Sequence, residues 1–164
     1  MDKEVKIELP EAAKNASEMP IDGPNFYDGL EEYEIEEMSI YLVPGLVEVE
    51  AEGYTKALAG EEDVVLILKE EKSLFGNYAS NMEEYIQLVV KANESRGITE
   101  AVYENGHPTF EYEFTGDGVT YKYYTVLLES DDAYWIVQFA CDKDQYDAKK
   151  PDYVDWADTV AFYE

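Results

Sequence analysis

Residues 107–141 read HPTFEYEFTGDGVTYKYYTVLLESDDAYWIVQFAC and contain three runs rich in aromatic and β-branched residues, which are typical of β-strands. The runs are separated by Gly116-Asp117-Gly118 and by Ser130-Asp131-Asp132, which favour turns. Upstream, Asn105-Gly106 predicts a tight hairpin, because both central residues of a type I′ turn need positive φ. Residues 98–104 therefore add a fourth strand, and the stretch predicts an antiparallel meander.

The register of this meander decides which side chains face the core. We expect residue 115 to oppose residue 119 across one turn, and residue 130 to oppose residue 133 across the next. One face is then apolar and predicts a core of Phe110, Tyr112, Phe114, Tyr124, Val126, Leu128, Trp135, Val137 and Phe139. The other face is mixed and carries Glu111, Glu113, Tyr121, Tyr123, Thr125, Leu127, Tyr134, Ile136 and Gln138. We expect a helix to cover only part of this mixed face.

Helical patterns lie on both sides of the meander. A capping residue followed three residues later by glutamate, and then apolar residues at helical spacing, predicts a helix over 81–96. A proline that can occupy the first turn predicts a terminal helix over 151–162. At the amino end, alternation predicts a strand over 4–10, and alanines at helical spacing predict a short helix over 11–19.

The segment between residues 30 and 54 is unusually acidic. The apolar run 40–43, the turn residues Pro44-Gly45 and the alternating valines and glutamates that follow predict a hairpin with charged faces. A second hairpin is expected from residues 55–59 and 64–69, where the run VVLIL predicts a central strand. Strands and helices that alternate irregularly in this way favour the α+β class, with helices packed on a mainly antiparallel sheet. No repeat or linker divides the chain, so residues 1–164 are expected to form a single domain.

The charge of the chain excludes two classes of partner. Its 38 acidic and 12 basic residues give a formal net charge of −26, which repels phosphates and anionic lipids. We therefore expect neither nucleic-acid nor membrane-surface binding. No apolar run is long enough to span a bilayer, and residues 1–10 contain no signal-peptide core.

The sequence contains no recognisable catalytic or metal-binding motif. The single histidine, His107, and the single cysteine, Cys141, are expected about 20 Å apart along the strands, too far to form a nucleophile–base pair. The acidic run from Asp142 lacks the glycine and the glutamate of a calcium loop. We expect no catalytic residue, metal or cofactor. The pair Glu111 and Glu113 has a spacing compatible with a glycosidase, but such pairs arise by chance in so acidic a chain.

The order of these segments resembles the PsbP-like fold. The segments that carry the resemblance are KIELP, VVLILKEEK, NMEEYIQLVVKANESRG, the strands from residue 98 to residue 141, and PDYVDWADTVAFYE. This family includes PsbP, the Ran-binding Mog proteins, DcrB-like proteins and small bacterial lipoproteins. The resemblance implies an α-β-α sandwich, with residues 30–54 as an acidic hairpin insertion. It also implies an extracytoplasmic lipoprotein anchored through a segment upstream of residue 1, or a cytoplasmic protein if Met1 is the true start.

Three functions remain open from the sequence. The first is a non-catalytic binding or accessory domain, a monomer, that engages a protein or cell-envelope component; the resemblance and the lack of catalytic motifs favour it. The second is a carbohydrate-binding module that uses exposed tyrosine rings. The third is a carboxylate-dependent glycosidase. The candidate partner-binding residues are those of the mixed face: Tyr121, Tyr123, Tyr134, Glu111 and Glu113.

Overall fold

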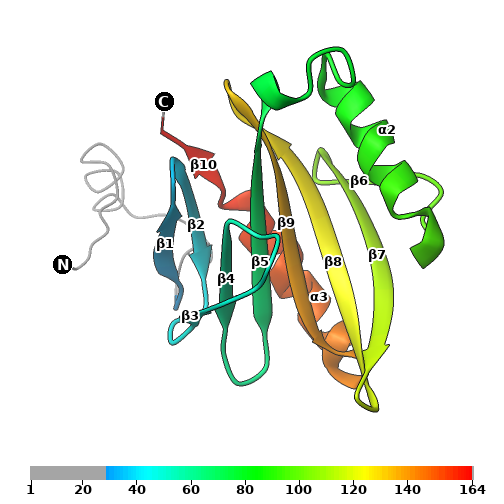
Figure 1. Cartoon of the computed structure of the whole chain (residues 1–164). Coiled ribbons are helices and arrows are strands. Elements are labelled where there is room, and N and C mark those ends of the chain that lie inside the picture. The colour runs from blue at the N-terminus through cyan, green and yellow to red at the C-terminus, as the bar shows by residue number, and fades with distance from the viewer. Residues whose placement is uncertain (1–28, 164) are drawn as a thin grey trace.

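The computed structural model describes residues 29–163 and contains two antiparallel sheets (Figure 1). The predicted strand 4–10 and helix 11–19 lie outside the described residues. In spatial order, the seven strands of the large sheet are β3 (Val47–Val49), β4 (Lys56–Ala59), β5 (Val64–Glu71), β9 (Ala133–Asp142), β8 (Val119–Glu129), β7 (His107–Gly116) and β6 (Val102–Glu104). The small sheet has the order β1 (Glu31–Ile35), β2 (Met38–Leu42) and β10 (Ala161–Phe162).

The meander predicted from the sequence is confirmed as strands β6, β7, β8 and β9. Asn105 and Gly106 have φ values of 52° and 84° and join β6 to β7 in the expected tight turn. The hairpin of β4 and β5 is also confirmed, and β5 pairs along its whole length with β9. The run VVLIL therefore lies inside the sheet, between two neighbours.

The predicted register is correct at one turn and wrong at the other. Ser130 bonds Ala133 across the β8–β9 turn as expected. At the β7–β8 turn, however, Gly116 pairs with Val119, and only Asp117 and Gly118 form the turn, with φ values of 53° and 79°. A shift of one residue moves every side chain of a strand to the opposite face. The aromatic residues of β7 therefore share a face with Tyr121 and Tyr123, and Glu111 and Glu113 lie on the other face.

Helix α2 (Met82–Ala92) follows the predicted capping box. The side chain of Asn81 accepts a hydrogen bond from the amide of Glu84, and the carboxylate of Glu84 accepts one from the amide of Ser80. The short 3₁₀ helix η2 (Glu94–Arg96) extends it, and Gly97 ends it with a φ of 85°. The predicted helix over 81–96 is thus present as two joined segments.

Helix α3 (Lys143–Asp158) begins earlier than predicted, directly after β9. The carboxylate of Asp142 accepts a hydrogen bond from the amide of Asp144 and caps the helix there. The prediction that Pro151 starts the helix was wrong, because Pro151 lies inside it, on the exposed side. The predicted end at residue 162 was also wrong, since the helix stops at Asp158 and the chain continues into β10.

The acidic segment 30–54 does not form the predicted hairpin across Pro44-Gly45. Strand β2 pairs instead with β1 on one side and β10 on the other, and the β1–β2 turn places Glu36 at a φ of 56°. Met38, Ile40 and Leu42 are fully buried, so β2 is the central strand of the small sheet. The Pro44-Gly45 turn then leads to β3, which pairs with β4 in the large sheet.

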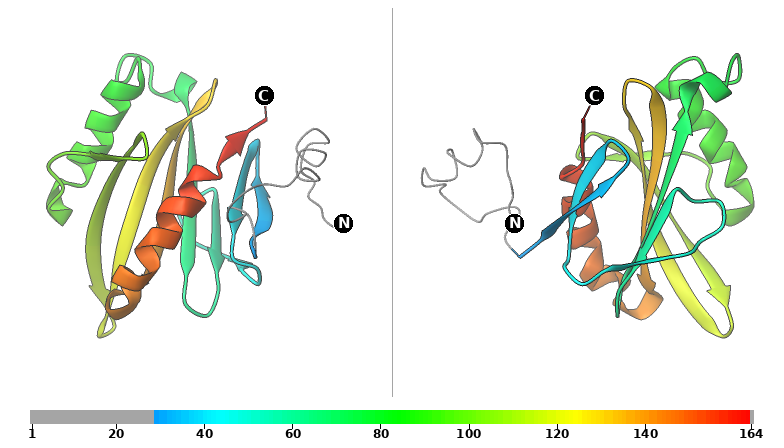
Figure 2. Two further views of the ribbon diagram at one scale, coloured as in Figure 1. Left: turned by 180° about the vertical axis from the view of Figure 1, so that it is seen from behind. Right: turned by 60° about the vertical axis from the view of Figure 1, so that its left-hand side comes forward.

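The elements form three layers, with the large sheet in the middle (Figure 2). Helix α3 and the small sheet cover one face, called here the α3 face, over a core that includes Tyr124, Trp135, Val137, Phe139 and Tyr153. Helix α2 packs on the opposite face, called the α2 face, over a smaller core that includes Tyr85, Val89, Phe110, Leu127 and Tyr134. The outcome is an α+β sandwich with helices on both sides of a mainly antiparallel sheet.

Candidate functional site

Part of the α2 face lies beyond the helix and is open to solvent (Figure 1). A row of register-paired side chains crosses six strands of this face: Val47, Ala59, Val64, Ala140, Tyr123 and Tyr112. Large apolar residues at the two ends are exposed, among them Val47 at 61% and Phe114 at 57%. We call this surface the open face. It is defined by the exposed side chains of Val47, Val49, Phe114, Val119 and Tyr121 and by the half-buried Tyr123.

A hollow of about 300 Å³ lies on the α2 face where η2 approaches the loop between β3 and β4. Its floor is apolar and consists of Leu68, Val89, Phe110 and Ile136. Its rim is polar and consists of Glu52, Gly53, Tyr54, Asn93, Arg96 and Gln138. We call it the Arg96 hollow. A concave apolar floor with a few polar groups around it is the usual composition of a ligand site.

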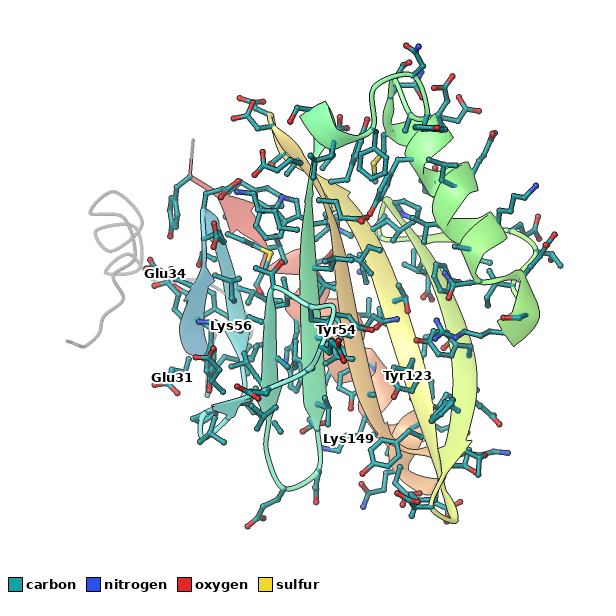
Figure 3. All side chains as sticks on the ribbon, viewed as in Figure 1. Glu31, Glu34, Tyr54, Lys56, Tyr123 and Lys149 are labelled. Carbon is teal, nitrogen blue, oxygen red and sulfur yellow. The ribbon has the colours of Figure 1, made fainter. Side chains whose placement is uncertain are left out.

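Gln138 connects the rim of the hollow to the open face. Its amide nitrogen donates hydrogen bonds to the hydroxyl of Tyr112 at 2.8 Å and to Thr125 Oγ1 at 3.0 Å. The hydroxyl of Tyr54 donates to the amide oxygen of Gln138 at 2.9 Å and fixes the β3–β4 loop on the sheet. Figure 3 shows Tyr54 and Tyr123 on the near side of the sheet, beyond the end of α2. Both polar atoms of the Gln138 side chain thus form hydrogen bonds within the protein.

Arg96 lies over the ring of Tyr112, with its guanidinium carbon 4.6 Å from the ring centroid. One of its nitrogens donates to Asn93 Oδ1 at 2.6 Å, and Asn93 in turn donates to the carbonyl of Val89. Burial raises the pKa of Tyr54, of Tyr112 and of Tyr123, and the charge of Arg96 partly offsets the rise at all three.

Within residues 29–163, Arg96 differs from most cations in having no ion pair. Lys69 pairs with three glutamates, and Lys149 and Lys150 pair with two carboxylates each. Between residues 29 and 163, no carboxylate lies within ion-pair distance of Arg96. Among the described residues, no carboxylate neutralises the guanidinium that lines the hollow.

The tyrosines predicted as partner-binding residues have three different environments. Tyr121 is 37% exposed and pairs with Phe114 on the open face. Tyr123 is half-buried, and its ring stacks on Tyr112 at 4.8 Å with an interplanar angle of 9°. Tyr134 is only 2% exposed and stacks on Tyr85 under α2. The structure therefore brings Tyr121 and Tyr123 to the surface and places Tyr134 in the core.

The predicted carboxylates lie on the α3 face, separate from these tyrosines. Glu111 accepts hydrogen bonds from Tyr146 at 2.6 Å and Lys150 at 3.1 Å, and Glu113 pairs with Lys143 at 3.3 Å. Burial alone would raise the pKa of Glu111, but the bonds from Tyr146 and Lys150 outweigh it and lower the pKa. A glycosidase acid needs a raised pKa. Glu111 and Glu113 bind side chains of α3 and thereby hold this helix on the sheet.

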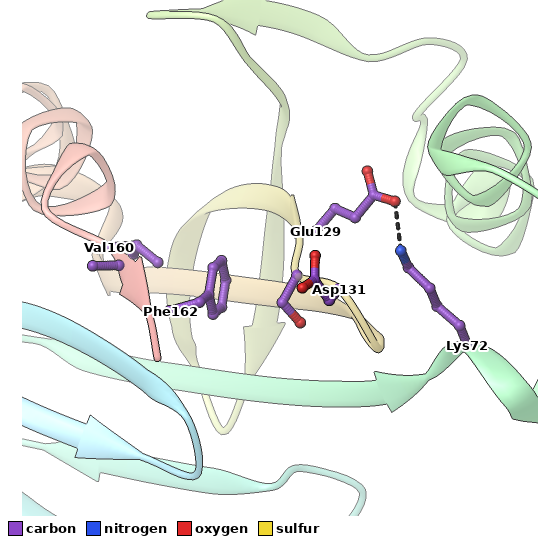
Figure 4. Close-up of a pocket in the computed structure, with 7 residues that line it drawn as sticks. Lys72, Glu129, Asp131, Val160 and Phe162 are labelled. Carbon is purple, nitrogen blue, oxygen red and sulfur yellow. Dashed lines mark hydrogen bonds and ion pairs between the residues drawn. The ribbon is translucent and has the colours of Figure 1, made fainter. Parts of the chain in front are cut away.

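A second, wider hollow of about 640 Å³ opens at the end of the sheet near the β8–β9 turn (Figure 4). Its lining includes Lys72, Glu129, Asp131 and Phe162. Lys72 donates to Glu129 at 2.7 Å, and this bond raises the pKa of Lys72. The lysine charge is therefore already neutralised, and the hollow offers no comparable binding group.

His107 and Cys141 have structural surroundings. His107 lies 3.2 Å from Asp158 at the end of α3, and Asn105 donates to the same carboxylate at 2.8 Å. Cys141 is fully buried in the core under α3, where burial raises the pKa of its thiol.

No group of three or more metal-binding side chains occurs in the described part of the chain. No helix among residues 29–163 is long and apolar enough to cross a membrane.

Tyr54, Arg96 and Gln138 were not identified from the sequence as site residues. One signal was available, because Arg96 is the only arginine of the chain. Tyr54 and Gln138 gave no comparable signal, since they are 84 positions apart and meet only when the β3–β4 loop folds over the sheet.

Comparisons with known proteins identify the fold. No protein-family model and no curated protein sequence matches the chain. Among solved structures, a protein of Bacteroides thetaiotaomicron has a TM-score of 0.54 at 15% identity; the match covers 78% of this chain but only 46% of that protein. The cyanobacterial PsbP of Synechocystis sp. PCC 6803 has a TM-score of 0.50 at 13% identity over 82% of this chain and 93% of its own.

The Ran-binding protein Mog1p of Saccharomyces cerevisiae also matches, with a TM-score of 0.50 at 10% identity, over 81% of this chain and 95% of its own. Identities this low show a common fold and say nothing of a shared activity. The layers, the strand order and these matches agree with the resemblance found in the sequence: the chain has the PsbP-like fold.

Proposed function

We propose that this protein is a non-catalytic binding domain that engages a protein partner through the open face. The observation that carries the proposal is the apolar and aromatic surface of the β7–β8 hairpin, where Phe114, Val119 and Tyr121 are exposed side by side; Val47 is exposed at the opposite edge of the sheet. Contiguous exposed apolar surface on a soluble domain marks an interaction site. Tyrosine is also among the residues most enriched at the energetic centres of interfaces, and Tyr121 and Tyr123 lie on this surface.

The charge of the protein defines the kind of partner. The net charge is −26, and exposed acids such as Glu50, Glu52 and Asp117 border the open face. Complementary charge speeds association and excludes like-charged competitors. The partner we propose is therefore a basic protein that presents an apolar patch. One protein of the same fold, Mog1p, is itself described as Ran-binding, which agrees with a protein-binding role.

Site-specific cross-linking in the source cells tests this proposal. A photoreactive phenylalanine at Tyr121 or Phe114 should give the same adduct, and one at Tyr163, which is exposed directly after β10, should not. The protein found in the adduct should bind the purified chain, and Phe114→Ser should weaken that binding at least tenfold. Equal adducts from Tyr163, or unchanged affinity of the Phe114→Ser variant, would contradict the proposal.

The two alternative functions receive less support. Stacking on a sugar needs accessible, coplanar rings. Tyr134 is buried and one side of Tyr123 is covered by Tyr112, so the three predicted tyrosines do not form such a platform. Glu111 and Glu113, the pair that a glycosidase would need, already bind Lys143, Lys150 and Tyr146. Neither alternative is proposed.

For the cellular location we propose an extracytoplasmic, lipid-anchored protein, following the resemblance of the sequence to small bacterial lipoproteins. The native protein should then take up labelled palmitate and separate with the membrane fraction. Recovery of unlabelled protein with the cytosol would contradict this location. Palmitate labelling and fractionation test only the location, and cross-linking tests only the open face. Either proposal can therefore fail without the other.

A further inference from the structure

The Arg96 hollow has the size and the lining of a small-ligand site. Its volume of about 300 Å³ lies at the lower end of the range for ligand pockets. Leu68, Val89, Phe110 and Ile136 give it an apolar floor drawn from β5, α2, β7 and β9. The floor therefore rests on regular elements on four sides, and it can accept an apolar or aromatic group of matching size.

The spare hydrogen-bonding capacity at the rim belongs to Arg96. A guanidinium carries five N–H donors, and the structure uses one nitrogen of Arg96 for Asn93 Oδ1. The other side-chain donors of the rim have partners: the hydroxyl of Tyr54 donates to Gln138, the amide of Gln138 donates to Tyr112 and Thr125, and the amide of Asn93 donates to the carbonyl of Val89. A ligand that accepts hydrogen bonds would therefore meet free donors mainly at Arg96.

The charge of Arg96 points to the same ligand class. The chain holds 38 acidic residues, yet none of those between residues 29 and 163 pairs with Arg96. Glu52 lines the same hollow but stays beyond ion-pair distance. The guanidinium carbon lies over the ring of Tyr112, 4.6 Å from its centroid. A planar, supported guanidinium is the preferred partner of a carboxylate, which it can bind through two parallel hydrogen bonds.

We propose that the Arg96 hollow binds an organic carboxylate whose apolar or aromatic body rests on the floor formed by Leu68, Val89, Phe110 and Ile136. Arg96 holds the carboxylate, and Glu52 weakens the binding by its like charge. The same chemistry occurs in free aryl or alkyl carboxylic acids and at the carboxyl terminus of a peptide. This site goes beyond the proposed protein-binding function, because it uses a different part of the α2 face and needs no protein partner.

Protein-observed NMR titration with phenylacetate tests the proposal directly. Phenylacetate should shift the amide signals of Gly53, Tyr54, Arg96 and Ile136, with a Kd in the millimolar range expected of a ligand of about ten non-hydrogen atoms. The neutral probe phenylacetamide has the same shape and should bind at least tenfold more weakly. Equal affinity for the two probes, shifts at other residues only, or no shifts at all would overturn the proposal.

Matched variants separate the guanidinium from general charge effects. Arg96→Gln should weaken phenylacetate binding at least tenfold, whereas Lys91→Gln removes one exposed positive charge from the last turn of α2 and should leave it unchanged. Glu52→Gln should tighten it. Unchanged binding by Arg96→Gln, in a variant whose other amide signals match the parent, would refute the role of Arg96.

A pair of peptides identifies the source of the carboxylate. Acetyl-Ala-Phe with a free carboxyl terminus should bind more tightly than phenylacetate if the natural ligand is a peptide end, and more weakly if it is a small acid. The amidated peptide should lose binding in either case, and binding as tight as that of the free acid would overturn the proposal. These results do not depend on the open face, since failure of the cross-linking experiment leaves the NMR titration unaffected.

Discussion

The hydroxyl of Tyr153 donates a 2.6 Å hydrogen bond to Asp63, a carboxylate that is only 5% exposed. Asp63 belongs to the β4–β5 turn and Tyr153 to α3, so the bond fixes the helix on the sheet. Lys149, one helical turn before Tyr153, lies 3.1 Å from the second oxygen of Asp63. A buried carboxylate is costly unless it is paired and hydrogen-bonded, and Asp63 meets both conditions.

Replacement of Tyr153 by phenylalanine should destabilise the protein by about 1.5–3 kcal/mol, the usual range for a hydrogen bond to a charged group. The ring keeps its packing on Phe139, so the loss reports the hydroxyl. Urea unfolding followed by tyrosine and tryptophan fluorescence measures the difference. Tyr163→Phe is the matched control, because its hydroxyl bonds Glu32 at the surface, and it should change the stability by less than about 0.5 kcal/mol.

Two tyrosines of the meander should lose very different amounts of stability when replaced by alanine. Tyr134→Ala should cost about 3–5 kcal/mol, since it removes a fully buried ring that stacks on Tyr85. Tyr121→Ala removes an exposed ring whose cross-strand neighbours are Phe114 and Asp142, and it should cost less than about 1 kcal/mol. Similar losses at both positions in urea unfolding would contradict the assignment of Tyr121 to the open face.

Much of the fold follows from local signals in the sequence. Asn105-Gly106 specifies its hairpin because few other residue pairs accept two positive φ angles in succession. The helix over 82–92 was predictable because Asn81 and Glu84 cap it before an apolar stripe begins. In both cases the interactions that determine the local structure are made between residues close together in the sequence, so a short sequence pattern is enough to predict it.

The register of β7 could not be predicted in this way. The sequence Gly116-Asp117-Gly118 fits a two-residue or a three-residue loop equally well, and the choice reverses the faces of the whole strand. An acidic residue on the α3 face looks unfavourable from the sequence. Glu111 is stable there because Tyr146 and Lys150 of α3 bond its carboxylate. Those partners lie 35 or more positions away.

The candidate site depends on the same kind of long-range contact. Arg96 reaches Tyr112 only because η2 returns the chain to β7, and Tyr54 reaches Gln138 only because the β3–β4 loop lies on the sheet. No local pattern encodes either approach. The residues that β8 and β9 contribute to this face were predicted correctly, whereas those of β7 were not. The division of the face into a covered part, an open face and a hollow was not predictable.

The two-residue turn between β7 and β8 can be tested at Gly118. Its φ of 79° is unfavourable for a residue with a side chain, although an added Cβ would meet no atom within 4 Å. Gly118→Ala should therefore cost about 1–2 kcal/mol from backbone strain alone. Asp117→Asn at the neighbouring positive φ should be nearly neutral, because asparagine tolerates this conformation. If Gly118→Ala has no effect on urea unfolding, the turn is not the one described.

Glu111 should contribute stability that depends on pH. The bonds from Tyr146 and Lys150 lower the pKa of Glu111 in the folded protein below its ordinary value, in spite of its burial. The unfolded chain therefore takes up a proton first as the pH falls, so this contribution is complete above the ordinary glutamate pKa of about 4.5 and is lost as the pH falls through the folded pKa.

Glu111→Gln should consequently lower the Tm at pH 7 and lose much of this deficit near pH 3. The comparison must be made between the two proteins at each pH, because protonation of the other 37 acids also relieves the repulsion of a chain with a charge of −26. Glu83→Gln, on an exposed position of α2, provides the control for removal of one negative charge. A Tm deficit of Glu111→Gln that is the same at both pH values would show that the carboxylate does not hold α3 through its charge.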